Sequence, residues 1–380
     1  MTEAPNREIS IPDDLLPGDG RFGSGPSKVR PEAVERLSGV SRSLLGTSHR
    51  QAPVKSLVGR VREGLSSLLS LPDGYEIVLG NGGTTLFWDA AVFGLVETKS
   101  QHLSFGEFSS KFASAVAAAP FLDAPEVISS DAGTHPEAVG RAGVDLYALT
   151  HNETSTGVSM EIRRPEGADA DALVAVDATS AAGGLRVDPS QFDVYYFAPQ
   201  KCFGSDGGLW LAACSPSAVE RIERLASSDR WIPTGLDLKV ALDNSRLDQT
   251  YNTPALTTLF LLADSVEWMN SSGGLEGMAT RCDRSAEILY GWAEASSFAT
   301  PFVEKPDERS HVVATIDFDA SIDADSLAKT LAANGIVDTF SYRKLGRNQL
   351  RIALFPTIEP DDVAALTRSI DFCVERLATA

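Results

Sequence analysis

Cysteine is scarce in this chain, and so are histidine and methionine: there are 4 Cys, 5 His and 4 Met among 380 residues. The cysteines, at positions 202, 214, 282 and 373, are widely spread and form no CxxC or Cys/His cluster. Disulfide frameworks and zinc sites both use cysteines at short, regular spacings. The sequence therefore predicts neither a disulfide framework nor a metal site, and a reducing, cytoplasmic compartment fits it best.

Long hydrophobic runs and an excess of basic residues are also absent. No uninterrupted apolar run approaches the length of a membrane span, and the N-terminus lacks the basic start and apolar core of a signal peptide. The 33 Lys+Arg residues are outnumbered by 52 Asp+Glu, and the formal net charge of −19 would repel a polyanion. We therefore expect no membrane and no nucleic acid as partners, and small molecules as substrates.

Apolar residues, in contrast, make up 43% of the chain, enough for a sizeable core. A length of 380 residues suits a large α/β domain followed by a smaller one. We predict a large domain over residues 1–270 and a small C-terminal α/β domain over 271–380, with the N-terminal arm packing on the small domain. The small domain is predicted to contain strands at 311–318 and 349–355, a helix at 323–334 closed by Gly335, and a terminal helix after Pro360.

The most informative stretch runs from residue 193 to residue 211. Residues 193–198 have the β-branched and aromatic content of a buried strand, and Lys201 follows the end of that strand. A glycine-rich loop then leads to a second apolar run at 209–213. A lysine at the edge of a sheet is usually a solvated surface residue, so Lys201 alone decides nothing.

Asp177 changes the interpretation of Lys201. It ends another predicted strand, residues 172–176, so both side chains are expected at the same end of two successive parallel strands. Active sites of open α/β sheets lie at the carboxyl ends of the strands. Pyridoxal phosphate needs such a pair, because an amine forms a Schiff base with it and a carboxylate keeps its ring nitrogen protonated.

An anion-binding turn is predicted near residue 80. A strand at 75–79 leads into Gly80-Asn81-Gly82-Gly83-Thr84-Thr85 and then into a helical run at 86–95. Free backbone N–H groups, the positive end of the helix dipole and two threonine hydroxyls would together cradle a phosphate. The turn matches neither GxGxxG nor GxxxxGK[ST], so a dinucleotide site or a P-loop is disfavoured. A tight turn with a capping threonine is the plain structural alternative.

Two further strand ends deliver aromatic and polar side chains. A strand at 102–105 precedes Phe108, which on its own would be assigned to the core. A strand at 144–149 precedes the Asn-Glu-Thr run at 152–154. The ends of the predicted strands therefore bring together a phosphate cradle, an aromatic ring, a polar run, an aspartate and a lysine.

Basic residues gather at two places in this acidic chain. His49 and Arg50 precede an amphipathic helix whose apolar stripe runs from residue 54 to 69. Between residues 339 and 358 there is no acidic residue but there are four basic ones, Arg343, Lys344, Arg347 and Arg351. Solvated surface positions would explain either group. A substrate that carries both a carboxylate and a phosphate would need guanidinium groups of this kind.

Together these motifs resemble the fold-type I, class V pyridoxal-phosphate aminotransferases, and among them the phosphoserine aminotransferase family of the actinobacterial type. The resemblance implies an aspartate-aminotransferase-like α/β fold with a mostly parallel seven-stranded sheet, and one pyridoxal 5'-phosphate per subunit. The motifs that carry it are FGSGPSKV at 22–29, TSHR at 47–50, NGGTT at 81–85, HNETSTG at 151–157, VDATS at 176–180, APQKCFG at 198–204 and YNTP at 251–254.

The resemblance also implies which residues hold the cofactor. Lys201 would form the Schiff base and then move the proton between the substrate Cα and the cofactor, while Asp177 would pair with the ring nitrogen. Phe108 would stack on the ring, and Thr154 would bind the ring hydroxyl. The cofactor phosphate would be held by Thr84, Thr85, Gln200, Asn252 and Thr253. In this family the Asn-Thr pair comes from the neighbouring subunit, so the resemblance implies a homodimer with shared active sites.

For the substrate, the resemblance implies that Arg351 binds the carboxylate and that His49, Arg50 and Arg343 bind the phosphate. The implied reaction transfers the amino group reversibly between L-glutamate and 3-phosphohydroxypyruvate, giving O-phospho-L-serine and 2-oxoglutarate in L-serine biosynthesis. The same resemblance extends to the formation of 4-phosphohydroxy-L-threonine in pyridoxine biosynthesis.

Three alternatives remain open at this point. Another class V enzyme, such as a serine- or alanine-glyoxylate aminotransferase, would use the same cofactor residues. A cysteine desulfurase usually has histidine before the lysine, where this chain has Gln200, and it needs a loop cysteine, which neither Cys202 nor Cys373 provides. A cofactor-binding regulatory domain would bring a basic DNA-binding helix pair, for which this acidic chain has no room.

Overall fold

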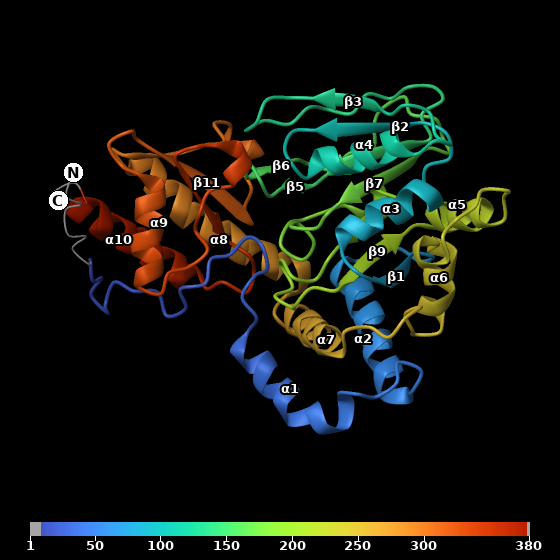
Figure 1. Ribbon diagram of the computed structural model, residues 1–380, viewed down its shortest axis with the longest axis horizontal. Coiled ribbons are helices and arrows are strands. Elements are labelled where there is room, and N and C mark those ends of the chain that lie inside the picture. Colours follow the sequence, from blue (N-terminus) through green and yellow to red (C-terminus); the bar gives the residue numbers. More distant parts are fainter. Residues whose placement is uncertain (1–8, 378–380) are drawn as a thin grey trace, which may run out of the picture.

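The structure is a computed structural model that describes residues 9–377. The first eight and the last three residues lie outside this range, so part of the N-terminal arm that was predicted to pack on the small domain is not described. A seven-stranded sheet forms the centre of the larger part of the molecule (Figure 1). Neighbouring strands are parallel except where β9 takes part, so the mostly parallel sheet expected from the sequence is confirmed. Its order is β1 (Glu76–Asn81), β9 (Leu209–Cys214), β8 (Val194–Phe197), β7 (Leu173–Asp177), β4 (Leu146–Thr150), β2 (Ser100–Ser104) and β3 (Glu126–Ser129).

Helices cover both faces of this sheet, and the strands alternate between two cores. In β1, Val78 belongs to one core, whereas Ile77 and Leu79 belong to the other. This alternation follows from the two-residue period of a strand, and burial on both faces explains why the strands are nearly all apolar. One face is covered by α2 (Ala52–Leu68) and α7 (Leu256–Ser271), and the other by α3 (Thr84–Gly94), α4 (Ser109–Ala118), α5 (Pro216–Ala226) and α6 (Leu238–Arg246).

A smaller unit with its own core follows α7 and lies beside the large sheet (Figure 1). Its three strands are antiparallel, and helices pack against them. Asp323 caps its middle helix through its side chain, as is typical of a helix N-terminus, and Gly335 follows that helix with φ +83°. The elements are α8 (Gly274–Ala295), β10 (Ala299–Pro301), β11 (Val313–Phe318), α9 (Ala324–Ala333), β12 (Gln349–Ala353) and α10 (Pro360–Leu377).

The N-terminal segment crosses from this smaller unit to the large one. Asn334 at the end of α9 accepts a hydrogen bond from the N–H of Ile11, and Ser369 of α10 donates to the carbonyl of Leu15. The chain then forms α1 (Pro31–Leu44), which begins with Pro31 at its first position and packs against α7. No helix among the described residues is long and apolar enough to cross a membrane.

Most predicted elements are present with ends shifted by one to three residues, as in the strand predicted at 349–355, which ends at Ala353. The strand predicted at 311–318 begins only at Val313, because the hydroxyl of Ser310 accepts hydrogen bonds from the N–H groups of Val312 and Val313. The Asn-Glu-Thr run is not a simple loop. Its first two residues form the short strand β5 (Asn152–Glu153), which pairs with β6 (Val158–Ser159).

Candidate active site

Lys201 and Asp177 lie at the same end of the sheet, as the sequence predicts. Asp177 ends β7, which runs parallel to β8, and Lys201 follows β8. The lysine is buried, and its Nζ donates a hydrogen bond to the carbonyl oxygen of Ser24 at 2.5 Å. Burial, with the nearby charge of Arg351, lowers the pKa of Lys201 to about 8. The amine is therefore a better nucleophile and base near neutral pH than an exposed lysine.

Asp177 is a buried carboxylate held by three hydrogen bonds. Its oxygens accept from the indole N–H of Trp88 at 3.1 Å, and from the backbone N–H and hydroxyl of Thr179 at 2.9 Å and 2.6 Å. Burial nevertheless raises its pKa to about 6, because these donors only partly offset the loss of water. A cation beside Asp177 would reverse this shift. The sequence analysis missed Trp88, and the only available signal was its place in the first turns of the helix after the glycine turn.

The predicted phosphate cradle is the N-terminus of α3. Thr84 is buried and its hydroxyl lies 2.8 Å from that of Thr179, whereas Thr85 is exposed. No side chain caps this helix, and Gly82 adopts φ +108°, a conformation that favours glycine. The helix N-terminus thus offers uncapped backbone N–H groups next to the hydrogen-bonded chain that leads to Asp177.

Thr154 belongs to a second group of hydroxyls and amides. It donates to the hydroxyl of Ser180 at 2.8 Å, and the side-chain amide of Asn152 donates to the same oxygen at 2.9 Å. Ser180 lies three residues after Asp177, in the turn that follows β7. The sequence analysis did not single out Ser180, although it is part of the quoted VDATS motif.

Arg351 joins the smaller unit to this group. Its Nη1 donates to the carbonyl of Thr154 at 3.3 Å, and its guanidinium lies 5.2 Å from the centre of the Tyr342 ring. Tyr342 in turn lies 5.8 Å from the ring of Phe108. Burial lowers the pKa of Arg351, and its buried Nε has no hydrogen-bond partner. Phe108 is half-buried: it packs against one of the two sheet cores and also faces Tyr342, a residue that no sequence pattern pointed to.

His49, Asn252 and Thr253 form a separate group. The hydroxyl of Thr253 lies 3.0 Å from Nδ1 of His49, and Asn81 contacts the backbone of both Asn252 and Thr253. Burial, and then the charge of Arg50, lower the pKa of His49. No hydrogen bond among residues 9–377 links this group directly to Lys201 or Asp177. The guanidinium of Arg50 is exposed and has no hydrogen-bond or ion-pair partner in the described part of the chain.

The four basic residues between 339 and 358 do not act as one cluster. Lys344 pairs with Glu107 at 2.5 Å, and Arg347 pairs with Asp317 and stacks on the ring of Phe302. Arg343 is exposed and lines a groove of about 640 Å³ on the smaller unit, together with residues of the α9 N-terminus. Of the four, only Arg351 contacts the residues around Thr154.

Several buried polar atoms in this region lack a hydrogen-bond partner, which is unusual for a folded protein. They come from segments far apart in the sequence. These atoms are Ser24 Oγ, Asn152 Oδ1, Gln200 Oε1 and Arg351 Nε. A ligand with several polar groups would satisfy them, and pyridoxal phosphate, with its phosphate, ring hydroxyl and ring nitrogen, fits this set of donors and acceptors. The described residues contain no group of three or more His, Cys, Asp or Glu that could hold a metal.

Comparison with known proteins decides the family. The Aminotransferase class-V family model matches residues 22–339. This chain belongs to the class-V aminotransferases. Its class-V relatives include the phosphoserine aminotransferase of a Nocardioides species, which is 59% identical over 99% of this chain and 100% of its own length. The putative phosphoserine aminotransferase of Mycobacterium leprae is 58% identical, with the same coverage of both chains.

Solved structures of class-V aminotransferases share the fold. A phosphoserine aminotransferase from Cytophaga hutchinsonii superimposes with a TM-score of 0.85 at 25% identity, covering 93% of this chain and 99% of that one. The enzyme from Bacillus circulans subsp. alkalophilus gives a TM-score of 0.82 at 22% identity, covering 94% and 99% of the two chains. The expected fold of a fold-type I pyridoxal-phosphate aminotransferase is therefore confirmed.

Proposed function

We propose that this protein is a pyridoxal-phosphate-dependent phosphoserine aminotransferase of L-serine biosynthesis. It would transfer the amino group reversibly between L-glutamate and 3-phosphohydroxypyruvate, giving O-phospho-L-serine and 2-oxoglutarate. The observation that carries the proposal is the buried pair of Lys201 and Asp177 at the carboxyl ends of β8 and β7. Class-V membership and two relatives of that name at 59% identity support it.

The residues around the pair have separate tasks in this reaction. When bound, pyridoxal phosphate supplies an electron sink for the electron pair left at the substrate Cα after proton removal. Lys201 would hold the cofactor and then, as a free amine, take the proton from the substrate Cα and deliver it to the cofactor, which its lowered pKa favours. The carboxylate of Asp177, oriented by Trp88 and Thr179, holds a proton at the ring nitrogen. Phe108 would lie against the ring, and Thr154 would bond the ring hydroxyl.

Two regions would recognise the substrate. The buried, unpartnered Nε of the half-buried Arg351 suits the substrate carboxylate, because a guanidinium binds a carboxylate with two parallel hydrogen bonds. His49 and the free, exposed guanidinium of Arg50 suit the phosphate, with Arg343 as a further contact. Thr84, Thr85 and Gln200 would hold the cofactor phosphate, and the unpartnered buried Oε1 of Gln200 indicates that this side chain faces a ligand.

A homodimer would complete the site. Asn252 and Thr253 are exposed on one chain, and the preceding Tyr251 is a 45% exposed aromatic residue, as expected for a surface that meets a second subunit. If these residues serve the neighbouring subunit, mixed dimers of the Lys201→Ala and Asn252→Ala proteins recover activity, because one of their two sites is intact. Failure of such mixtures to gain activity would argue against shared sites.

The first experiment is an absorbance titration of the purified protein with pyridoxal phosphate. The expected result is a yellow band that disappears on addition of O-phospho-L-serine and remains with unphosphorylated serine. Loss of the band with serine or alanine would keep the cofactor and assign the protein to another class V aminotransferase. A protein that takes up no cofactor would overturn the proposal as a whole.

A matched pair of variants tests the phosphate clamp. Arg50→Ala should lower kcat/KM for O-phospho-L-serine by about tenfold to a hundredfold, because it removes one charge-assisted contact. Arg42→Ala, which changes an exposed arginine of α1, is the control and should leave kcat/KM unchanged. Equal rates for Arg50→Ala and the unmodified protein would show that Arg50 does not bind the phosphate.

A desulfurase is disfavoured by the buried state of every cysteine, since a sulfur acceptor must reach the substrate.

The proposal also includes a cytoplasmic location and, as a second activity at the same site, formation of 4-phosphohydroxy-L-threonine in pyridoxine biosynthesis. That second activity is tested by the same absorbance assay with 4-phosphohydroxy-L-threonine as the amino donor.

A further inference from the structure

Glu153 is a charged side chain with no exposed surface, and no step of the proposed reaction uses it. Its Oε2 accepts hydrogen bonds from the backbone N–H groups of Phe108 and Ser109, at 3.0 Å and 2.7 Å. Its Oε1 accepts from the backbone N–H and the hydroxyl of Ser155, at 3.0 Å and 2.7 Å. The carboxylate is therefore fully hydrogen-bonded between two segments of the large unit.

These contacts connect Glu153 to the turn that carries Phe108. Ser109 begins α4, so the carboxylate sits at the positive end of that helix dipole, where a negative charge is favoured. Ser155 extends the contact, because its hydroxyl accepts a hydrogen bond from the N–H of Glu107 at 3.1 Å. A Cβ added at Gly106 would lie 2.4 Å from Cδ of Glu153, so glycine at this position lets the backbone come close to the carboxylate. The turn 106–109 is thus held against one side chain.

We propose that Glu153 is a positioning residue that sets the orientation of the Phe108 ring toward the cofactor. This inference rests on the proposed function, in which Phe108 lies against the cofactor ring. Glu153 and Thr154 are consecutive residues, so the same short segment that bonds the ring hydroxyl through Thr154 fixes the aromatic wall through Glu153.

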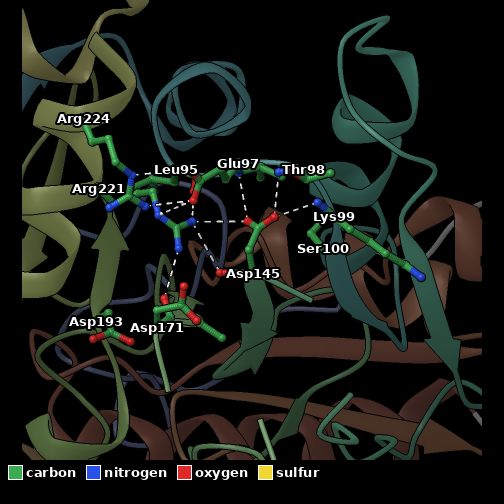
Figure 2. A network of polar contacts seen from close by, with 12 residues as sticks. Leu95, Glu97, Thr98, Lys99, Ser100, Asp145, Asp171, Asp193, Arg221 and Arg224 are labelled. Carbon is green, nitrogen blue, oxygen red and sulfur yellow. Dashed lines mark hydrogen bonds and ion pairs between the residues drawn. The ribbon is translucent and has the colours of Figure 1, made fainter. Parts of the chain in front are cut away.

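A purely structural role is the competing explanation, and the molecule contains a matched control for it. Asp145, at the opposite end of the sheet, also accepts hydrogen bonds from consecutive backbone N–H groups, those of Glu97, Thr98 and Lys99 (Figure 2). Glu153→Gln and Asp145→Asn both replace a carboxylate that accepts from backbone N–H groups and place an amide NH₂ opposite at least one of those donors. Asp145→Asn also weakens the ion pair with Arg221, so it tests whether a loss of stability alone changes the bound cofactor. Both should lower stability, and only the first should change the bound cofactor.

The test measures the visible circular dichroism of the bound cofactor and its dissociation constant, with unfolding of the cofactor-free protein followed separately. Glu153→Gln should reduce the dichroism and weaken cofactor binding about tenfold, the size of one lost charge-assisted hydrogen bond. In a Phe108→Leu background the same substitution should add less than about twofold, because its route to the cofactor is already removed. Asp145→Asn should leave both cofactor signals unchanged. If Glu153→Gln fails to fold, Glu153→Asp, which keeps the charge but shortens the side chain, is measured in the same way.

The outcomes separate the two hypotheses. An unchanged cofactor signal in Glu153→Gln, or an equal effect with and without Phe108, would overturn the positioning role and leave the proposed function intact. If Phe108→Leu binds the cofactor as tightly as the unmodified protein does, the positioning role is also overturned, because Phe108 would then not face the ring. Failure of the unmodified protein to bind pyridoxal phosphate would instead overturn the proposed function, and this inference with it.

Discussion

The two ends of the central sheet differ in how completely their buried polar groups are paired. At the amino end, the guanidinium of Arg221 is 2% exposed and donates to the backbone carbonyls of Leu95 and Asp171 and to the carboxylate of Asp145 (Figure 2). It also pairs with Glu97 at 3.3 Å. At the carboxyl end, polar atoms of Gln200, Asn152 and other residues are buried without partners.

This difference separates a structural network from a binding site. A buried charge that is fully paired holds elements together, and removing one partner leaves an uncompensated charge. Buried polar atoms without partners are unfavourable in the free protein, and those at the carboxyl end would become paired if a ligand bound there. The pKa values agree with this division, because burial raises that of Asp177 to about 6 and lowers that of Lys201 to about 8.

The largest expected effect is the loss of activity in Lys201→Ala. We expect kcat/KM to fall by at least about 10³-fold, since the variant has neither the amine that binds the cofactor nor the base. The urea midpoint of the cofactor-free protein should stay the same or rise, because a buried amine is replaced by an apolar side chain. A marked loss of stability would mean that Lys201 also belongs to the structural framework, and the contrast between the two ends would fail.

Arg221→Ala should give the opposite pattern. The carbonyls of Leu95 and Asp171 would lose this donor and Asp145 its cationic partner, so the free energy of unfolding should fall by about 3–5 kcal/mol, while kcat/KM per folded molecule is unchanged. The control is Arg224→Ala on the same helix, which pairs with Glu97 from a 47% exposed position and should cost about 1 kcal/mol or less. Denaturant unfolding measures both variants. An effect of Arg221→Ala on the kcat/KM of folded protein would contradict the division.

The pH dependence of stability tests whether ionisation of the buried Asp177 carboxyl destabilises the folded protein. Its pKa is raised from 3.8 to about 6, so its ionisation is more costly in the folded than in the unfolded protein. The stabilisation is fully present below pH 3.8 and is lost as the pH rises through about 6. Relative to Asp177→Asn, the cofactor-free protein should therefore lose about 2 kcal/mol between pH 4 and pH 7.

Bound cofactor should change this pH dependence of stability. A protonated ring nitrogen beside Asp177 favours the carboxylate, so the loss of stability toward neutral pH should shrink or reverse when pyridoxal phosphate is present. Urea unfolding across this pH range, with and without cofactor, provides the measurement. If the difference in free energy of unfolding between the unmodified protein and Asp177→Asn is the same at all pH values, the pKa of Asp177 is not raised by folding.

The smallest effect is expected at the contact between the two units. Lys344 pairs with Glu107 from a 69% exposed position, where solvent and salt screen the interaction. Lys344→Ala should leave the urea midpoint unchanged and alter KM for O-phospho-L-serine by less than about threefold. A larger rise in KM, with kcat preserved, would indicate that this ion pair holds the segment carrying Tyr342 over the site.

Local patterns were sufficient for most of the secondary structure and for the centre of the site. The apolar runs before Asp177 and Lys201 predicted strands, and parallel strands place the ends of consecutive strands at one edge, so both residues could be brought together without coordinates. The glycine turn before Thr84 was equally visible, because glycine followed by a helical run indicates a strand-to-helix junction. These inferences use only the periods of strands and helices and the chemistry of turns.

What only the tertiary structure decided are contacts between residues distant in the sequence. Trp88 donates to Asp177 and Ser24 accepts from Lys201 across 89 and 177 residues, respectively. Lys344 finds its acidic partner 237 residues away, so the absence of acids between 339 and 358 did not make that segment a free basic cluster. The sequence by itself determined which elements form and which chemistry they carry. The packing of those elements, which no local pattern encodes, determined which charges are paired and which remain for a ligand.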